Sequence, residues 1–308
     1  MNKIYETTLV KPLFFKGVGL HSGLSSEIKI FPADSNSGIN FKRVDVKKNN
    51  IIHANYNKVT SAKLCTTLEN EYGVKVSTVE HLLAALYIAE IDNALIEINT
   101  EEVPIMDGSA KNFIDTIKNS KLKTLPVKRK YLKVINKFEF KDGKRKISIE
   151  PNNDTFNVEF ELDYQNKLIG KQKNNVDFQK DNLEEIIEAR TFCLYEDIEK
   201  IKKIGLAKGG SLENAIVVDE NKVLNEGGLR NQKEFVNHKI LDLAGDFVLS
   251  GYRILGKVKC HQGGHELSNL FLKNLFLEKT ENFRIIELNK KHSVEFSSKN
   301  FTQIAVNA

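Results

Sequence analysis

Several features that define other protein classes are missing from this chain of 308 residues. It has only three cysteines, Cys65, Cys193 and Cys260, which lie far apart and form no CxxC pair. An odd number of scattered cysteines argues against a disulfide framework and against a thiolate zinc site, and it favours a reducing compartment. The first residues, MNKIYETTLVKPLFF, lack the apolar core of a signal peptide, and no window approaches transmembrane length. We therefore expect a cytoplasmic protein without a transmembrane segment.

Dense basic segments are missing as well. The 46 lysines and arginines exceed the 41 acidic residues by only five, and they are spread along the whole chain. Because no basic block with interleaved aromatic residues exists, we expect no nucleic-acid partner. The mild positive excess suits an anionic small molecule, but solubility explains it equally well. A length of 308 residues predicts two domains.

The first half of the chain offers strands and then a buried helix. Strand-like alternation at the start is interrupted by a glycine-rich turn at residues 17–23. A helix containing LLAALYIA follows, for which the hydroxyl of Ser77 or Thr78 is a plausible N-cap, and a strand at 93–98 comes next. Because this helix is apolar on every face, we expect it to be buried.

The second half repeats the order of strands first and a helix later. Two alternating runs are joined by Asp142-Gly143, a hairpin turn signal, and a helix from about Glu234 to Ser250 precedes a strand at 252–259. We therefore predict an α+β fold of two similar layers packed face to face. Residues 120–130 are basic and contain a proline, which makes them the best linker candidate. The predicted domains are residues 1–124 and 125–308.

Imidazole and carboxylate side chains line up on the helix predicted near residue 240. At about 100° per residue, His238, Asp242 and Asp246 fall within roughly 80° of arc, with Lys239 at the edge of this stripe. A histidine and a carboxylate four residues apart can bind one metal ion, and both suit zinc. The alternative is a stripe that simply faces water.

Glu80 and His81 begin a helix that is otherwise apolar. A buried glutamate and a buried histidine are costly unless they are paired or bound to a metal. The alternative is a carboxylate favoured by the helix dipole beside a satisfied core histidine. Two histidines and one aspartate with an open fourth position are typical of a catalytic zinc site, for which a nearby glutamate is a natural general base. Because HExxH is absent, the chain is not an ordinary zincin.

Two glycine-containing segments are less specific. Residues 260–265 place His261 and His265 beside paired glycines, and a histidine opposite a metal can act as a cationic acid or stabilise an oxyanion. Residues 204–212 lack the spacing of GxGxxG and of the P-loop, so they do not indicate a nucleotide fold. We interpret them as an apolar loop that is able to line an apolar passage.

A series of stretches, in one order along nearly the whole chain, is far more specific than any single motif. They are GVGLHSG (17–23), STVEHLLAAL (77–86), NALIEIN (93–99), VPIMDGSA (103–110), ARTFC (189–193), GLAKGGSLENAIV (205–217), LRNQKEFVNHKILDLAGDFVLSG (229–251) and GGHELSN (263–269). Together they resemble the UDP-3-O-acyl-N-acetylglucosamine deacetylase family, the enzymes of the first committed step of lipid A synthesis. The resemblance implies two α+β layers that sandwich their helices, each half carrying a small insertion.

The resemblance also implies a set of catalytic roles. It implies zinc on His81, His238 and Asp242, with Glu80 as the base that activates water for attack on the acetamide carbonyl. Thr191 would help to stabilise the oxyanion through its hydroxyl. His265, kept protonated by Asp246, would stabilise developing charge and could protonate the leaving amine. The sequence leaves open how proton transfer is divided between Glu80 and His265.

A UDP-linked acylated amino sugar is the substrate that the resemblance implies. Lys239 and His21 would hold its sugar–diphosphate part. The insertion at about 193–217 would form a hydrophobic passage for the acyl chain, with Phe192 near its mouth and with Leu206, Gly210 and Ser211 as further substrate contacts. We expect a monomer that makes transient contact with a membrane surface.

Two positions depart from the family pattern, and two other functions compete. Asn112 stands where the family usually has proline, and Lys208 is more polar than a passage lining requires.

One competing function is that of another zinc hydrolase, such as a deacetylase of a different sugar or a small-molecule deaminase, which would not need an apolar passage. The other is a non-catalytic acyl-ligand binding protein whose histidines are structural.

Overall fold

The N-terminal half of the chain folds around a five-stranded sheet. The computed structural model describes residues 3–152, 154–277 and 281–289. In spatial order the strands are β2 (Leu13–Val18), β3 (Ser25–Pro32), β9 (Ala94–Ile98), β4 (Ile39–Arg43) and β5 (Ile51–His53). β4 and β9 are parallel, and the other neighbours are antiparallel. One face of the sheet is buried because apolar and polar residues alternate, as at Ile28, Lys29 and Ile30.

The C-terminal half carries a seven-stranded sheet. Its main path is β12 (Phe138–Asp142), β13 (Arg145–Glu150), β19 (Arg253–His261), β11 (Lys130–Val134) and β20 (Phe283–Glu287). β14 (Phe156–Asp163) also pairs with β19, and β15 (Lys171–Asp177) pairs with β14. The predicted Asp142-Gly143 hairpin is confirmed, since Asp142 pairs with Arg145 across the turn.

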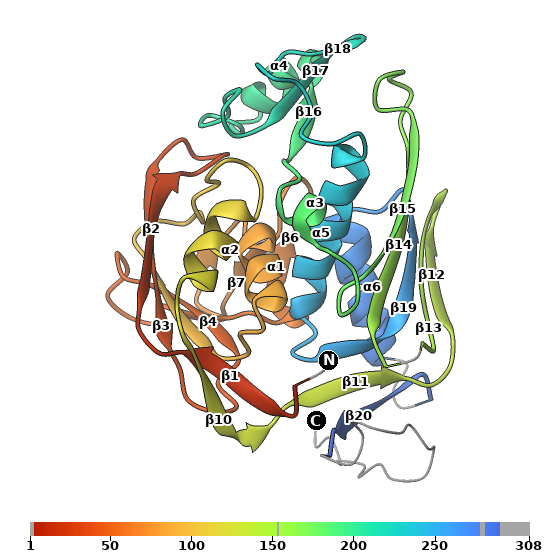
Figure 1. The fold of residues 1–308 in the computed structure, drawn as a ribbon. Coiled ribbons are helices and arrows are strands. Elements are labelled where there is room, and N and C mark those ends of the chain that lie inside the picture. The colour runs from red at the N-terminus through yellow and green to blue at the C-terminus, as the bar shows by residue number, and fades with distance from the viewer. Residues whose placement is uncertain (1–2, 153, 278–280, 290–308) are drawn as a thin grey trace.

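Helices lie between the two sheets, as Figure 1 shows for α1, α2, α5 and α6. The helices are α1 (Glu80–Ile88), α2 (Lys111–Lys118), α3 (Glu184–Ile187), α5 (Glu234–Val248) and α6 (His265–Leu277). This arrangement confirms the α+β sandwich, the buried first helix and the long helix after residue 233. Among the described residues, no helix is both long and apolar enough to cross a membrane.

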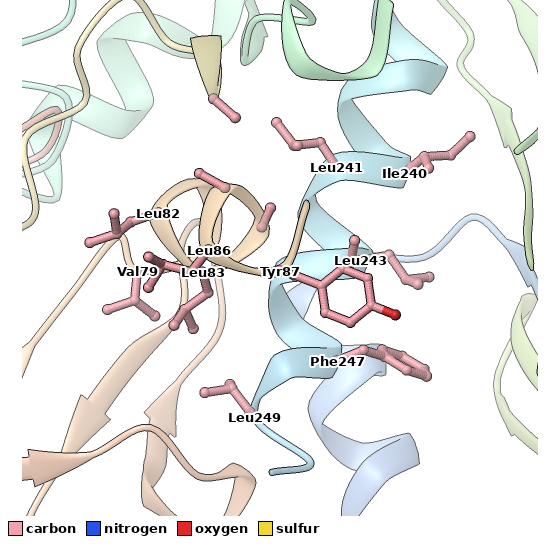
Figure 2. Packing of buried hydrophobic residues seen from close by; sticks show 14 of the residues in the cluster. Val79, Leu82, Leu83, Leu86, Tyr87, Ile240, Leu241, Leu243, Phe247 and Leu249 are labelled. Carbon is pink, nitrogen blue, oxygen red and sulfur yellow. The ribbon is translucent and has the colours of Figure 1, made fainter. Parts of the chain in front are cut away.

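The two central helices, α1 and α5, pack closely against each other. Leu241 points from α5 toward α1, whereas Leu82 of α1 and Leu243 of α5 point away from this contact, and all three are fully or almost fully buried (Figure 2). A Cβ atom placed on Gly245 would lie only 2.0 Å from the carbonyl oxygen of Glu80. A glycine is therefore needed at this crossing, which brings the polar stripe of α5 against the first turn of α1.

Each half carries a small insertion. The first contains the 3-10 helix η1 (Tyr56–Lys58) and the three-stranded sheet β6 (Val59–Ser61), β7 (Thr67–Glu69) and β8 (Lys75–Val76). The second contains β16 (Phe192–Leu194), α4 (Tyr195–Lys203), β17 (Ile216–Asp219) and β18 (Lys222–Val223). The second insertion forms its own sheet, and it stands apart from the two large layers (Figure 1).

The predicted linker at 120–130 is wrong. Residues 122–128 form β10 (Leu122–Lys128), which pairs with β1 (Tyr5–Leu9). Pro126 is tolerated because the pairing register is irregular between Tyr5 and Thr7, opposite Lys128 and Thr124. Of the residues that suggested a linker, Lys121 and Lys123 are exposed, whereas Leu125 and Arg129 are buried.

The predicted N-cap of the first helix is also wrong. The N-cap of α1 is Val79, which makes no side-chain cap hydrogen bond. The Thr78 hydroxyl instead donates to Glu102 Oε1 over 2.9 Å, and the Ser77 hydroxyl donates to the Glu101 carbonyl. An N-cap hydroxyl accepts from a helix N–H and its residue has an extended backbone, whereas the Thr78 hydroxyl is turned toward this carboxylate and Thr78 has a φ of 57°.

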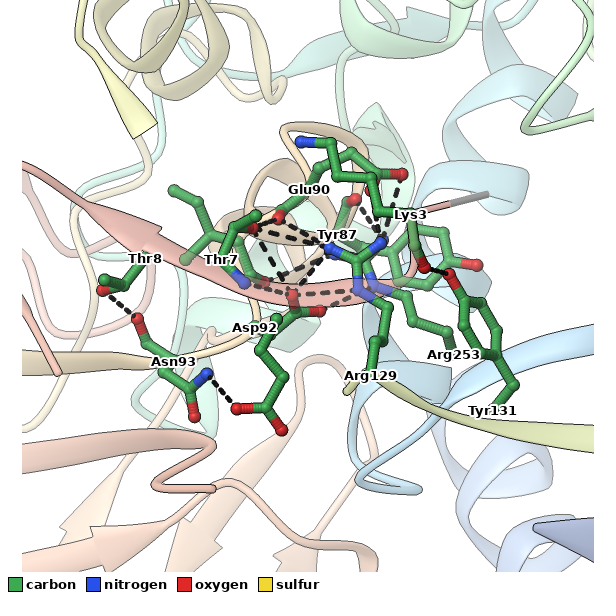
Figure 3. A network of polar contacts seen from close by, with 12 residues as sticks. Lys3, Thr7, Thr8, Tyr87, Glu90, Asp92, Asn93, Arg129, Tyr131 and Arg253 are labelled. Carbon is green, nitrogen blue, oxygen red and sulfur yellow. Dashed lines mark hydrogen bonds and ion pairs between the residues drawn. The ribbon is translucent and has the colours of Figure 1, made fainter. Parts of the chain in front are cut away.

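Ion pairs between two buried arginines and two partly buried carboxylates connect the segment after α1 to the C-terminal sheet (Figure 3). Arg129, just before β11, contacts both Glu90 and Asp92, and the distance from its Nη2 to Asp92 Oδ2 is 2.6 Å. Arg253 at the start of β19 contacts Asp92 Oδ1 at 3.2 Å. These pairs link segments from both halves of the chain.

Candidate active site

Three buried side chains from α1 and α5 form a compact group. His81 stands in the first turn of α1, and His238 and Asp242 are one turn apart on α5. Both Nε2 atoms lie 3.3 Å from Asp242 Oδ1, and the candidate ligand atoms all lie within 4.8 Å of one another. The structure thus brings together the three residues predicted as metal ligands.

The hydrogen bonding of this group fits a cation. His238 Nδ1 donates to the carbonyl of Ala189 over 3.0 Å, which leaves its Nε2 lone pair directed toward Asp242. Burial lowers the pKa of His238 to about 3, so its imidazole is neutral. Asp242 Oδ1 is buried and has no hydrogen-bond partner among the described residues. A neutral imidazole and an unsatisfied carboxylate oxygen at this spacing are suitable ligands for zinc.

Lys239 neutralises the other oxygen of Asp242. Its Nζ lies 2.9 Å from Asp242 Oδ2 and 5.5 Å from the centroid of the Phe192 ring. Burial alone would raise the pKa of Asp242, but the positive charges of Lys239 and His265 outweigh it and hold that pKa well below its usual value. The carboxylate is therefore ionised and available as a ligand.

Glu80 and His265 face each other beside the group of three. Glu80 Oε1 lies 3.7 Å from His265 Nε2, and Glu80 Oε2 accepts a hydrogen bond from the Thr66 N–H over 3.1 Å. Burial raises the pKa of Glu80. His265 Nδ1 lies 3.0 Å from Asp246 Oδ2. Burial alone would lower the pKa of His265, but Asp246, Glu80 and Asp242 outweigh it and raise the value to about 10.

A cavity of about 290 Å³ gathers most of the predicted site residues. Those in its lining are His21, Glu80, His81, Thr191, Phe192, His238, Lys239, Asp242 and His265. Asp246 does not line the cavity and lies behind His265, where it contacts the Nδ1 side of the ring. This placement matches a supporting carboxylate rather than a fourth metal ligand.

A second cavity of about 350 Å³ opens beside the first and is lined mostly by apolar side chains of the second insertion. The two cavities share Leu20, His21, Leu64, Thr191 and Phe192. Gly210 and Ser211 line the second cavity, whereas Leu206 does not and its neighbour Ala207 does. Lys208 is exposed outside the lining, so this departure from the family pattern leaves the cavity apolar.

Glu102 is a buried residue of the site region that the sequence did not single out. Its carboxylate accepts hydrogen bonds from the N–H groups of His21 (2.8 Å) and Ser22 (2.7 Å) as well as from Thr78. It thereby fixes the glycine-rich turn at 17–23 against the segment before α1. No pattern marks Glu102 in the sequence, because it stands in an ordinary polar run after β9.

Comparison with known proteins identifies the family. The sequence profile of the UDP-3-O-acyl N-acetylglycosamine deacetylase family matches residues 6–277. The chain belongs to this family. A protein of Geotalea uraniireducens named UDP-3-O-acyl-N-acetylglucosamine deacetylase is 40% identical over 285 residues, covering 92% of each chain. Proteins of the same name from Pasteurella multocida (38% over 306 residues, 98% of this chain and 100% of the relative) and Histophilus somni (40% over 294 residues, 94% and 96%) are similar throughout.

Membership of the deacetylase family confirms the resemblance found in the sequence. The matched region contains the helices that carry the His81, His238 and Asp242 group and the whole second insertion. The match ends at residue 277, where α6 ends.

Proposed function

We propose that this chain hydrolyses the N-acetyl group of UDP-3-O-(3-hydroxyacyl)-N-acetylglucosamine and releases acetate, as a step of lipid A biosynthesis. One observation carries the proposal: an apolar cavity opens directly beside a buried His, His and Asp group that Glu80 and His265 flank. An acyl chain needs an apolar lining, and an amide needs a hydrolytic centre. The names of the related proteins describe a substrate with both features.

Zn²⁺ is the metal that we propose for His81, His238 and Asp242. Two imidazole nitrogens and one carboxylate oxygen suit zinc, and three protein ligands leave a position open. Bound zinc supplies Lewis acidity, which makes water more acidic and an amide carbonyl more electrophilic. His238 is prepared for this role because Ala189 fixes its tautomer.

Glu80, Thr191 and His265 supply the proton transfers and the charge stabilisation. Glu80 takes a proton from the attacking water. Burial raises the pKa of Glu80, which makes its carboxylate a stronger base. Thr191 lines the cavity, and its hydroxyl donates to the developing oxyanion. His265, held as a cation by Asp246, stabilises the same charge and gives a proton to the leaving amine.

The substrate would lie across the junction of the two cavities. Lys239 and His21 contact its sugar–diphosphate part, and Phe192, shared by both cavities, stands where the acyl chain enters the passage. Gly210 and Ser211 line that passage.

We further propose that the protein acts in the cytoplasm as a monomer and reaches its substrate by transient contact with a membrane surface. Its three cysteines are unpaired, which suits a reducing compartment. We also propose domains at residues 1–124 and 125–308, with the boundary inside β10 and the β1–β10 ribbon shared between them.

Acetate release by wild type, Glu80→Ala and His265→Ala, together with metal analysis, tests the proposal. We expect one zinc per chain in all three proteins and a loss of at least about a hundredfold in kcat for each variant. Acetate release from other acetylated sugars but not from the UDP-linked substrate would indicate a different zinc hydrolase. A folded wild type without metal or activity would indicate an acyl-ligand binding protein.

A further inference from the structure

The N–H, the carbonyl and the hydroxyl of Thr66 are all hydrogen-bonded to α1, to the N-cap of α1 or to α5. It stands immediately before β7 in the first insertion and is 2% exposed. Its N–H donates to Glu80 Oε2 over 3.1 Å, and its carbonyl accepts from the N–H of Val79 at 3.5 Å. Its hydroxyl donates to Asp246 Oδ1 over 2.7 Å. One residue is thus hydrogen-bonded to carboxylates on both α1 and α5.

We infer that Thr66 is a positioning residue. It holds the Asp246 carboxylate, and through it the His265 ring, in a fixed position relative to Glu80. The inference rests on the proposed function, in which Glu80 and His265 act on the same acetamide group. Asp246 Oδ1 lies 2.7 Å from the Thr66 hydroxyl and 3.1 Å from His265 Nδ1. The hydroxyl therefore fixes the rotation of the carboxylate that orients the histidine ring.

The relative position of Glu80 and His265 matters because the two residues lie on separate helices, α1 and α6. His265 Nε2 lies 3.7 Å from Glu80 Oε1, and both atoms border the cavity where the acetamide would lie. Without the hydroxyl, the Asp246 carboxylate is free to turn and the ring of His265 follows it. Thr66 itself lines neither cavity, so its loss leaves the substrate contacts in place.

Thr66→Val tests this role, since it removes the hydroxyl, keeps the backbone N–H bond to Glu80 and preserves the branched shape. We expect kcat for acetate release to fall about ten- to a hundredfold, as small misplacements of catalytic groups do, with KM and zinc content unchanged. Thr66→Ser keeps the hydroxyl and should restore kcat to within about threefold of wild type. Thr67→Val is the matched control, because within the described residues the Thr67 hydroxyl contacts only the Cys65 sulfur, at 3.9 Å.

The outcomes separate this inference from the proposed function. A wild type that releases no acetate contradicts the proposed function before any variant is compared. An active wild type with wild-type kcat in Thr66→Val overturns only the positioning role, and so does a serine variant that is no better than valine. If the valine variant does not fold, Thr66→Ala replaces it with the same expectation. Failure of both to fold would make Thr66 structural and overturn the inference.

Discussion

At the residue scale, Asp242 has the surroundings of a metal ligand. Oδ2 is paired with Lys239, while Oδ1 faces two imidazole Nε2 atoms and accepts no hydrogen bond in the described part of the chain. A buried carboxylate oxygen without a partner costs free energy, and a cation bound between these three groups would remove that cost.

Asp242→Ala should therefore release the metal. We expect zinc affinity to fall by more than about a hundredfold, since losing only an outer partner of a ligand already costs about ten- to a hundredfold. Metal analysis after dialysis measures this. Asp115→Ala, on the exposed side of α2, is the control and should keep its zinc. An Asp242→Ala protein with full zinc content would show that the ligand set is wrong.

Much of the site was predictable at this scale because helical periodicity is local. His238, Asp242 and Asp246 share a face through spacing alone, and Glu80-His81 is conspicuous in an apolar helix. Thr66 and Glu102 were not predictable, because their partners are up to 180 residues away in sequence. The family resemblance, and not the helix geometry, predicted that Asp246 supports His265 instead of binding the metal. The contact of Asp246 with His265 Nδ1 is consistent with this prediction.

At the element scale, α4 and the strands around it give the second cavity its apolar lining. Ile201 and Ala207 line this cavity, as do residues of β16 and β17. The sequence predicted an insertion at about 193–217 with a glycine-rich loop before a strand, whereas the structure extends this insertion to β18 at Lys222–Val223. The cavity lining could not be predicted, because Leu206 and Ala207 are equally apolar and only the path of the loop decides which of them lines the cavity. The linker error has a similar origin, since the basic composition of β10 does not reveal its pairing with β1.

Ile201→Trp should narrow the passage without touching the catalytic groups. We expect KM for a long-chain substrate to rise at least about tenfold, since each excluded methylene forfeits about 0.8 kcal/mol of burial. An analogue with a very short acyl group should bind as it does to wild type. Ile204→Trp is the matched control, because Ile204 is 61% exposed and lies outside the cavity lining. If Ile201→Trp and Ile204→Trp change KM equally for the long-chain substrate and for the short-chain analogue, the second cavity is not the acyl passage.

At the scale of the whole molecule, partly buried ion pairs connect the two halves at Glu90, Asp92, Arg129 and Arg253 (Figure 3). Burial alone would raise the pKa of Glu90, but Arg253 and Arg129 outweigh it and hold it below its usual value of 4.5. A carboxylate with a lowered pKa stabilises the fold above its unfolded-state pKa. That contribution is lost as the pH falls through the folded-state value.

The free energy of unfolding should therefore decrease as the pH falls below 4.5, the usual pKa of Glu90. Urea unfolding at a series of pH values measures this. Glu90→Gln should make the protein less stable at neutral pH and flatten the decrease, because the amide does not titrate. Glu71→Gln is the control, because Glu71 is exposed and, in the described part of the chain, is paired only with Lys58. A Glu90→Gln protein with the wild-type pH dependence would show that this network does not govern acid stability.

Acetate release measured together with bound zinc, before and after chelation, tests the central proposal most directly. The structure predicts one zinc per chain, loss of acetate release from the UDP-linked acylated sugar when the zinc is removed, and recovery when zinc is returned. A folded wild-type protein that binds no zinc would contradict the proposal, and so would undiminished acetate release after all metal has been removed.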